Sequence, residues 1–170
     1  MSRVRLIEDP DGLSPEQGEV FDSIIASRGK MLRPFAVLLH RPDLASAVAD
    51  LGTVIRYQGS LSDHLRELAI FTTAIERDCE YEWSAHLPLA RHAGVSEETL
   101  DAVQRRVSLE DLSDAAVVEF VRELCRTGRV SDATFDGVGK TYGEEGTVEL
   151  VATVAYYTMM AFVMSAFEAC

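Results

Sequence analysis

The sequence of 170 residues predicts an all-α protein, with a single compact domain over residues 1–170. Apolar residues recur at intervals of three and four along most of the chain, which is typical of amphipathic helices. Serine or proline precedes several of these segments, as at helix N-termini, and no segment alternates like a half-buried strand. The hydrophobic share of 47% and the charged share of 26% are ordinary for a soluble domain with an adequate core.

The first helix is expected to run to about Arg28 and to end at Gly29. Its start has the serine cap, first-turn proline and glutamine of a capping box, which are Ser14, Pro15 and Gln17. A short apolar connector is expected over residues 33–40. A second helix should open at Pro42 and stop near Gly59. Four apolar residues share one of its faces: Leu44, Val48, Leu51 and Ile55.

A third helix is predicted from a cap at Ser62 to about Asp78. Residues 68–75 of this helix carry no charge, and a helix that is apolar all round is buried all round. The next helix should end at Gly94. Later helices are expected to start at serines, which are Ser96, Ser113 and Ser131.

An apolar C-terminal helix is predicted to begin near Glu144 or Glu145. Its segment from Leu150 to Phe167 is of borderline length for a membrane span, contains hydroxyl side chains and has no basic flank. We therefore expect a buried helix or a subunit interface, and no membrane partner.

Charge and cysteine content narrow the function classes. The formal net charge is -12 and the arginines are scattered, which argues against nucleic acid and against an anionic membrane surface as partners. The three cysteines, Cys79, Cys125 and Cys170, are odd in number and widely spaced, so no disulfide framework is indicated. No signal peptide opens the sequence, and a reducing cytoplasm is the expected location.

The most informative segment is residues 79–86. In a helix Cys79, Glu82 and His86 fall on one stripe, because residues three, four and seven apart share a face. Trp83 lies on the same stripe and is interpreted as a core residue. A thiol, a carboxylate and an imidazole are costly to bury, so their place on an inward face indicates acid–base or thiol chemistry.

Glu67 adds a second carboxylate, directly before the uncharged run of the third helix, and His64 lies one turn earlier. A carboxylate at the mouth of a buried helix suits general acid–base work. The alternative is an ion pair with Arg66 or Arg77. Taken singly, a buried histidine is more often a core residue and a buried cysteine a small hydrophobe. Together the groups predict a catalytic set, namely Glu67, Cys79, Glu82 and His86. Neighbouring side chains are candidate substrate-binding residues, namely His64, Tyr81 and Trp83.

No metal and no cofactor are predicted. His64, Glu67, Glu82 and His86 have helical spacing, but they lack the inward Glu-x-x-His pairs of di-iron bundles. The segment from Gly137 to Thr141 looks like the end of a phosphate loop, but Thr134 stands where that motif needs glycine.

Three segments resemble the carboxymuconolactone decarboxylase family, which shares its fold with alkyl hydroperoxidase D. They are Arg66–Ile70, Cys79–His86 and Ala93–Val95. The segments 28–42 and 148–166 extend the likeness over most of the chain, around a family core of about 44–128. The resemblance implies a compact AhpD-like subunit that oligomerises as a trimer or a hexamer.

The resemblance also implies roles for the motif residues. In the hydroperoxidase branch a glutamate, a CxxC pair and a histidine form a thiol proton relay. Glu67, Cys79 and His86 match the glutamate, the first cysteine and the histidine, whereas Glu82 replaces the second cysteine. The dithiol–disulfide cycle of that branch is therefore not expected. The true decarboxylases work on a lactone acid by proton transfer, without a thiol pair.

The leading hypothesis is a small-molecule enzyme that decarboxylates, or shifts a double bond in, a lactone or enol acid. Glu67 or Glu82 would serve as acid or base, His86 would relay the proton, and Cys79 would line the site. The alternative is a thiol peroxidase in which Cys79 attacks the peroxide and an external thiol resolves it. A third hypothesis is a non-catalytic binding protein on the same scaffold. The two carboxylates oppose a Cys79 thiolate, so slow reaction with peroxide is expected.

Overall fold

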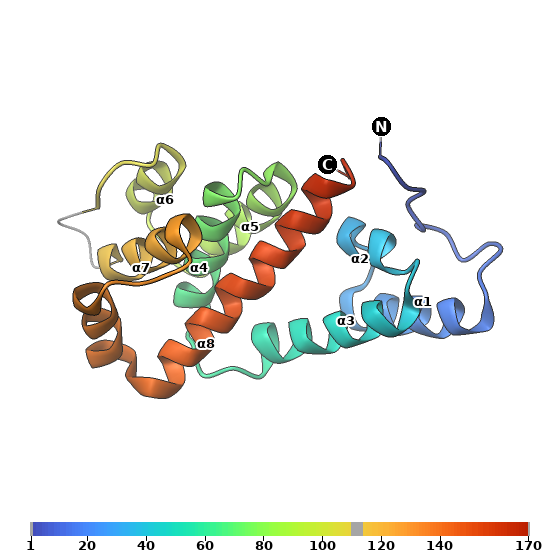
Figure 1. The fold of residues 1–170 in the computed structure, drawn as a ribbon, viewed down its shortest axis with the longest axis horizontal. Helices are drawn as coiled ribbons and strands as arrows, with labels where there is room; N and C mark the ends of the chain where they lie inside the picture. The colour runs from blue at the N-terminus through green and yellow to red at the C-terminus, as the bar shows by residue number, and fades with distance from the viewer. Residues whose placement is uncertain (1, 110–113, 170) are drawn as a thin grey trace. The chain divides into compact units, whose positions relative to one another are not determined.

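The computed structural model describes residues 2–109 and 114–169, and these residues form eight helices and no strand (Figure 1). The all-α prediction is confirmed. The described residues form two compact units, one from residues 2–58 and 162–169 and one from residues 59–161. The single domain over residues 1–170 stays a prediction. The helix start expected at Ser113 lies outside the described residues.

Helix α1 (Pro15–Arg28) begins and ends as its sequence predicts. The Gln17 amide donates to Ser14 Oγ at 3.2 Å, and the Ser14 amide donates back to Gln17 Oε1 at 3.1 Å. This capping box satisfies two of the amides that a helix N-terminus leaves without intrahelical partners. Gly29 ends α1 with a φ of 76°, a left-handed conformation that glycine adopts without steric cost.

The segment expected as a connector contains a short helix, α2 (Arg33–Leu38), whose residues 34–37 are buried. Helix α3 (Pro42–Tyr57) buries only part of the apolar face that its sequence shows. Val48 and Ile55 are buried, but Leu44 and Leu51 are each 47% exposed. The buried side also contains small residues, which let neighbouring helices approach closely: Ala45, Ala49 and Gly52. The apolar band of α3 is therefore wider than its buried face.

In the second unit α4 (Asp63–Glu76) is the central helix. It packs against α5 (Glu80–His92) and α7 (Ala115–Thr127), and more lightly against α6 (Glu97–Gln104). Every residue from 67 to 75 is buried, which confirms that the uncharged run predicts a helix surrounded on all sides. This burial fixes α4 as the rigid element from which Glu67 projects.

Helix α8 (Asp132–Ala166) is interrupted at Gly143, whose φ of 69° and ψ of -175° are not helical. This break agrees with the predicted start of the C-terminal helix near residue 144. Helix α8 is long and apolar enough to cross a membrane by length and composition alone, but half of its apolar 18-residue window is buried inside the protein. Core helices of soluble proteins meet the same criterion.

A carboxylate on α8 holds the loop that leads into α4. Glu149 Oε2 accepts from the Ser60 amide at 2.7 Å and from Ser60 Oγ at 2.8 Å, and Glu149 Oε1 accepts from the Leu61 amide at 3.2 Å. A Cβ on Gly59 would meet the Glu149 carboxylate, so only glycine leaves room for this clamp. Two helix turns further along α8, Tyr156 and Tyr157 are buried.

Candidate active site

The centre of the candidate site is a buried pair between α4 and α5. His86 Nδ1 lies 2.7 Å from Glu67 Oε2, and the side chains are only 5% and 6% exposed. A carboxylate accepts hydrogen bonds, so Nδ1 donates in this pair and Nε2 is the nitrogen left for other partners. Glu67 thus has an imidazole as its close partner. Arg66 Nε stands farther off, at 4.0 Å, and Arg77 instead donates to the Cys125 carbonyl.

Glu82 approaches the same imidazole from the other side. Its Oε2 lies 3.8 Å from His86 Nε2, within ion-pair range but too far for a hydrogen bond, and its side chain is 7% exposed. One imidazole therefore lies between two buried carboxylates. Groups arranged in this way can take a proton at one nitrogen while the other is held in place.

Cys79 is fully buried at the N-cap of α5, one turn before Glu82. Its carbonyl accepts from the Trp83 amide at 3.1 Å, which closes the first turn of α5. The structure thus brings Glu67, Glu82 and His86 together and places Cys79 at the start of the same helix.

Sequence reasoning missed a residue that touches the imidazole. The ring of Tyr157, on α8, meets the ring of His86 edge-on, with centroids 5.1 Å apart and planes at 84°. Tyr156 makes a similar contact with Tyr157 at 5.3 Å. The available signal was a pair of tyrosines inside an otherwise apolar helix, and it was interpreted only as evidence against a membrane span.

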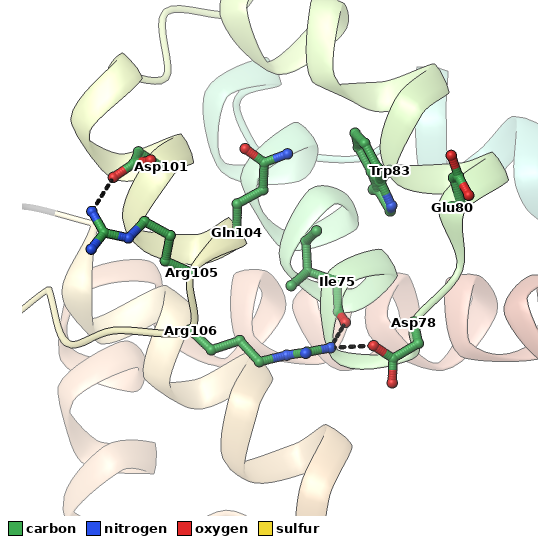
Figure 2. A pocket seen from close by; sticks show the side chains of 8 residues that line it. All are labelled: Ile75, Asp78, Glu80, Trp83, Asp101, Gln104, Arg105 and Arg106. Atoms are coloured by element: carbon green, nitrogen blue, oxygen red, sulfur yellow. Dashed lines mark hydrogen bonds and ion pairs between the residues drawn. The ribbon is translucent and has the colours of Figure 1, made fainter.

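Two of the candidate substrate-binding residues, His64 and Trp83, have contacts outside the Glu67–His86 pair. His64 Nε2 is 2.8 Å from Asp114 Oδ1, so His64 is engaged with the start of α7. Tyr81 is half-buried. Trp83, also half-buried, packs against the core and lines a cleft of about 620 Å³ (Figure 2). The cleft-lining residues are Ile75, Asp78, Glu80, Trp83, Asp101, Gln104, Arg105 and Arg106. None of the four predicted catalytic residues is among them.

Two further groups near the C-terminal end of α4 have structural partners. The Glu76 side chain is only 4% exposed and accepts two hydrogen bonds from Arg126, at 2.8 and 2.9 Å, while Arg122 Nε lies 3.6 Å from it. Burial raises the pKa of the Cys125 thiol. In residues 2–109 and 114–169, no group of three or more His, Cys, Asp and Glu side chains is arranged to hold a metal ion.

Comparison with protein families identifies the segment that holds this site. Residues 42–120 match the carboxymuconolactone decarboxylase family, and they contain Glu67, Cys79, Glu82 and His86. This segment, residues 42–120, belongs to the carboxymuconolactone decarboxylase family. The resemblance drawn from the motif residues is thereby confirmed. No curated protein matches the chain.

Solved structures show that the chain has the AhpD-like fold. An alkylhydroperoxidase AhpD core protein from Ralstonia eutropha JMP134, described as uncharacterized and peroxidase-related, is 18% identical with a TM-score of 0.79. The alignment covers 99% of this chain and 91% of that one. A peroxidase-related protein from Silicibacter sp. TM1040 is 15% identical with a TM-score of 0.78, over 98% and 90% of the two chains.

A third similar structure is a cysteine-to-alanine variant of the debrominase Bmp8 in complex with 2,3,4-tribromopyrrole. It is 17% identical with a TM-score of 0.75, and the alignment covers 99% of this chain and 92% of that chain. Identities this low show the fold alone.

Proposed function

We propose that this protein is a proton-transfer enzyme that acts on a small lactone or enol acid, by decarboxylation or by a double-bond shift. The observation that supports this most strongly is the buried contact of 2.7 Å between His86 Nδ1 and Glu67 Oε2, with Glu82 on the opposite side of the ring. Glu67 orients the imidazole, and His86 moves the proton through Nε2. Glu82, at 3.8 Å from that nitrogen, exchanges the proton with it.

The positions of Cys79 and Glu82 favour proton transfer over thiol chemistry. Cys79 is 0% exposed, and a thiol that reacts readily with peroxide is normally at least partly exposed. Glu82 stands where a resolving cysteine of a CxxC pair would stand, so an internal disulfide cycle has no second thiol in the motif. In this proposal Cys79 lines the site.

A second candidate is a thiol peroxidase that depends on Cys79 and an external reductant. One observation favours it: Cys79 is the N-cap residue of α5, and a helix N-terminus favours a thiolate. In that case the thiolate attacks the peroxide oxygen to give a sulfenic acid and an alcohol. One external thiol then condenses with the sulfenic acid to a mixed disulfide and water, and a second external thiol releases the Cys79 thiol and leaves as the external disulfide.

We also propose that the protein is a cytoplasmic homotrimer or homohexamer. Large apolar side chains are exposed on α3 and α8, namely Leu44, Leu51, Val54, Tyr57, Val148, Val151 and Phe162. Exposed apolar stripes of this kind are typical of subunit interfaces. Light scattering coupled to size-exclusion chromatography should give a trimer or a hexamer, and a monomer at micromolar concentration would contradict this.

The proposed reaction is tested by proton NMR in D₂O, with a panel of unsaturated γ-lactone acids and β-oxo acids as reactants. The wild-type protein should convert or deuterate at least one class, and H86A and E67Q should each lower the rate by about 10²- to 10⁴-fold. His92 is a matched control because it lies on the same helix and is exposed. H92A should keep the wild-type rate, whereas an unchanged rate in H86A would refute the proposal.

A further inference from the structure

Arg66 lies between the solvent and the buried pair. One of its terminal nitrogens is 2.7 Å from Oδ1 of Asp63, a residue whose side chain is 80% exposed. Its Nε lies 4.0 Å from Glu67 Oε1, the carboxylate oxygen that is not bonded to His86. The Arg66 side chain is only 12% exposed, so the guanidinium extends from the surface to the edge of the candidate site.

The buried part of this guanidinium has an unused donor. Arg66 Nε is buried and has no hydrogen-bond partner among the described residues. A buried N–H without a partner is destabilising, so such a group needs an explanation. A bound ligand oxygen is one explanation that fits its position beside Glu67.

The surface contact of Arg66 is weak enough to be exchanged. An ion pair with an exposed partner contributes little to stability, and Asp63 is such a partner. A guanidinium binds a carboxylate through two parallel hydrogen bonds, so a ligand anion can replace Asp63 at little cost. Glu67 and Glu82 are carboxylates like such a ligand, and the positive guanidinium beside Glu67 offsets the repulsion between like charges.

We infer that Arg66 binds an anionic oxygen of the substrate and releases Asp63 when it does so. The site then takes small molecules that bear a carboxylate, or that place negative charge on oxygen as an enolate does. This inference rests on the proposed function, because it assigns a residue that holds the substrate of the Glu67–His86 centre. Arg66 is thus a substrate-binding residue, and in the free protein Asp63 occupies the place of the substrate anion.

The test uses an unreactive pair of probes, 5-oxotetrahydrofuran-2-carboxylate and its methyl ester, whose binding is measured by NMR titration. The wild-type protein should bind the acid at least about tenfold more tightly than the ester, which corresponds to one charge-assisted hydrogen bond. R66Q should bring the ratio of the two affinities to about one, and R66K should keep part of it. D63N should raise the affinity for the acid by up to about fivefold, because the competing carboxylate is removed.

A purely structural role for the Asp63–Arg66 pair makes the opposite prediction for D63N, namely weaker or unchanged binding of the acid. That result overturns the inference, as do equal affinities for acid and ester in the wild type, or no binding of the acid at millimolar concentration. If R66Q fails to fold, D63N and R66K still test the role of Arg66.

A preference for the acid without any proton transfer supports the role of Arg66 and refutes the proposed function. Equal turnover of acids and esters refutes Arg66 alone.

Discussion

Replacing Glu67 should destabilise the protein by an amount that depends on what replaces it. Glu67 and His86 are both buried, and removing one partner of such a pair leaves the other without compensation. E67A should therefore cost about 3–5 kcal/mol of the free energy of unfolding. E67Q keeps an oxygen that can accept from His86 Nδ1 and loses only the charge, so we expect about 1–2 kcal/mol.

Equilibrium unfolding in urea measures this, with the fluorescence of Trp83 as the signal. Trp83 is the one tryptophan of the chain, lies on α5 and packs against the core. D63A is the matched control, because Asp63 lies on the same helix and its side chain is 80% exposed. It should cost no more than about 1 kcal/mol. A cost below about 1 kcal/mol for E67A, with unchanged NMR shifts of the His86 ring nitrogens, would refute the geometry of the pair.

Three further outcomes are expected. E149A should cost about 2 kcal/mol in urea unfolding, because two amides and a hydroxyl lose a charged acceptor, whereas E145A, at an exposed position of the same helix, should be neutral. Burial raises the pKa of the Cys125 thiol, so iodoacetamide should alkylate it more slowly at neutral pH than it alkylates an exposed thiol. The rate of alkylation should rise only at more alkaline pH, and fast labelling at neutral pH would contradict this. Y157L should broaden or shift the NMR signal of the His86 ring, and Y157F should not, because phenylalanine keeps the ring contact.

Much of the fold could be predicted because local chemistry decides it. The capping box at Ser14, the glycine at position 29 and the uncharged run of α4 each specify their own conformation. The apolar face of α3 does not by itself show which of its residues are buried, because Leu44 and Leu51 are as apolar as the buried Val48 and Ile55. Which apolar side faces inward depends on the helices packed against it, and helical spacing does not contain that information.

At the candidate site, contacts within one helix could be predicted from the sequence, whereas contacts between helices could not. Glu82 and His86 are four apart on one helix, and their contact follows from helical geometry. The pairing of Glu67 with His86 joins two helices, and the sequence left Arg66 and Arg77 as equal alternatives. Tyr157 is 71 residues from His86 along the chain and comes from α8, so only tertiary packing brings the two rings together.

The most direct test of proton transfer as the function compares the wild-type protein with C79S in two assays on the same preparations. One follows proton transfer on lactone and enol acids in D₂O, and the other follows consumption of cumene hydroperoxide with dithiothreitol as reductant. We expect C79S to keep more proton-transfer activity than H86A or E67Q, and every variant to consume hydroperoxide slowly. Rapid hydroperoxide consumption that is lost in C79S would contradict the central claim and assign the protein to thiol peroxidase chemistry.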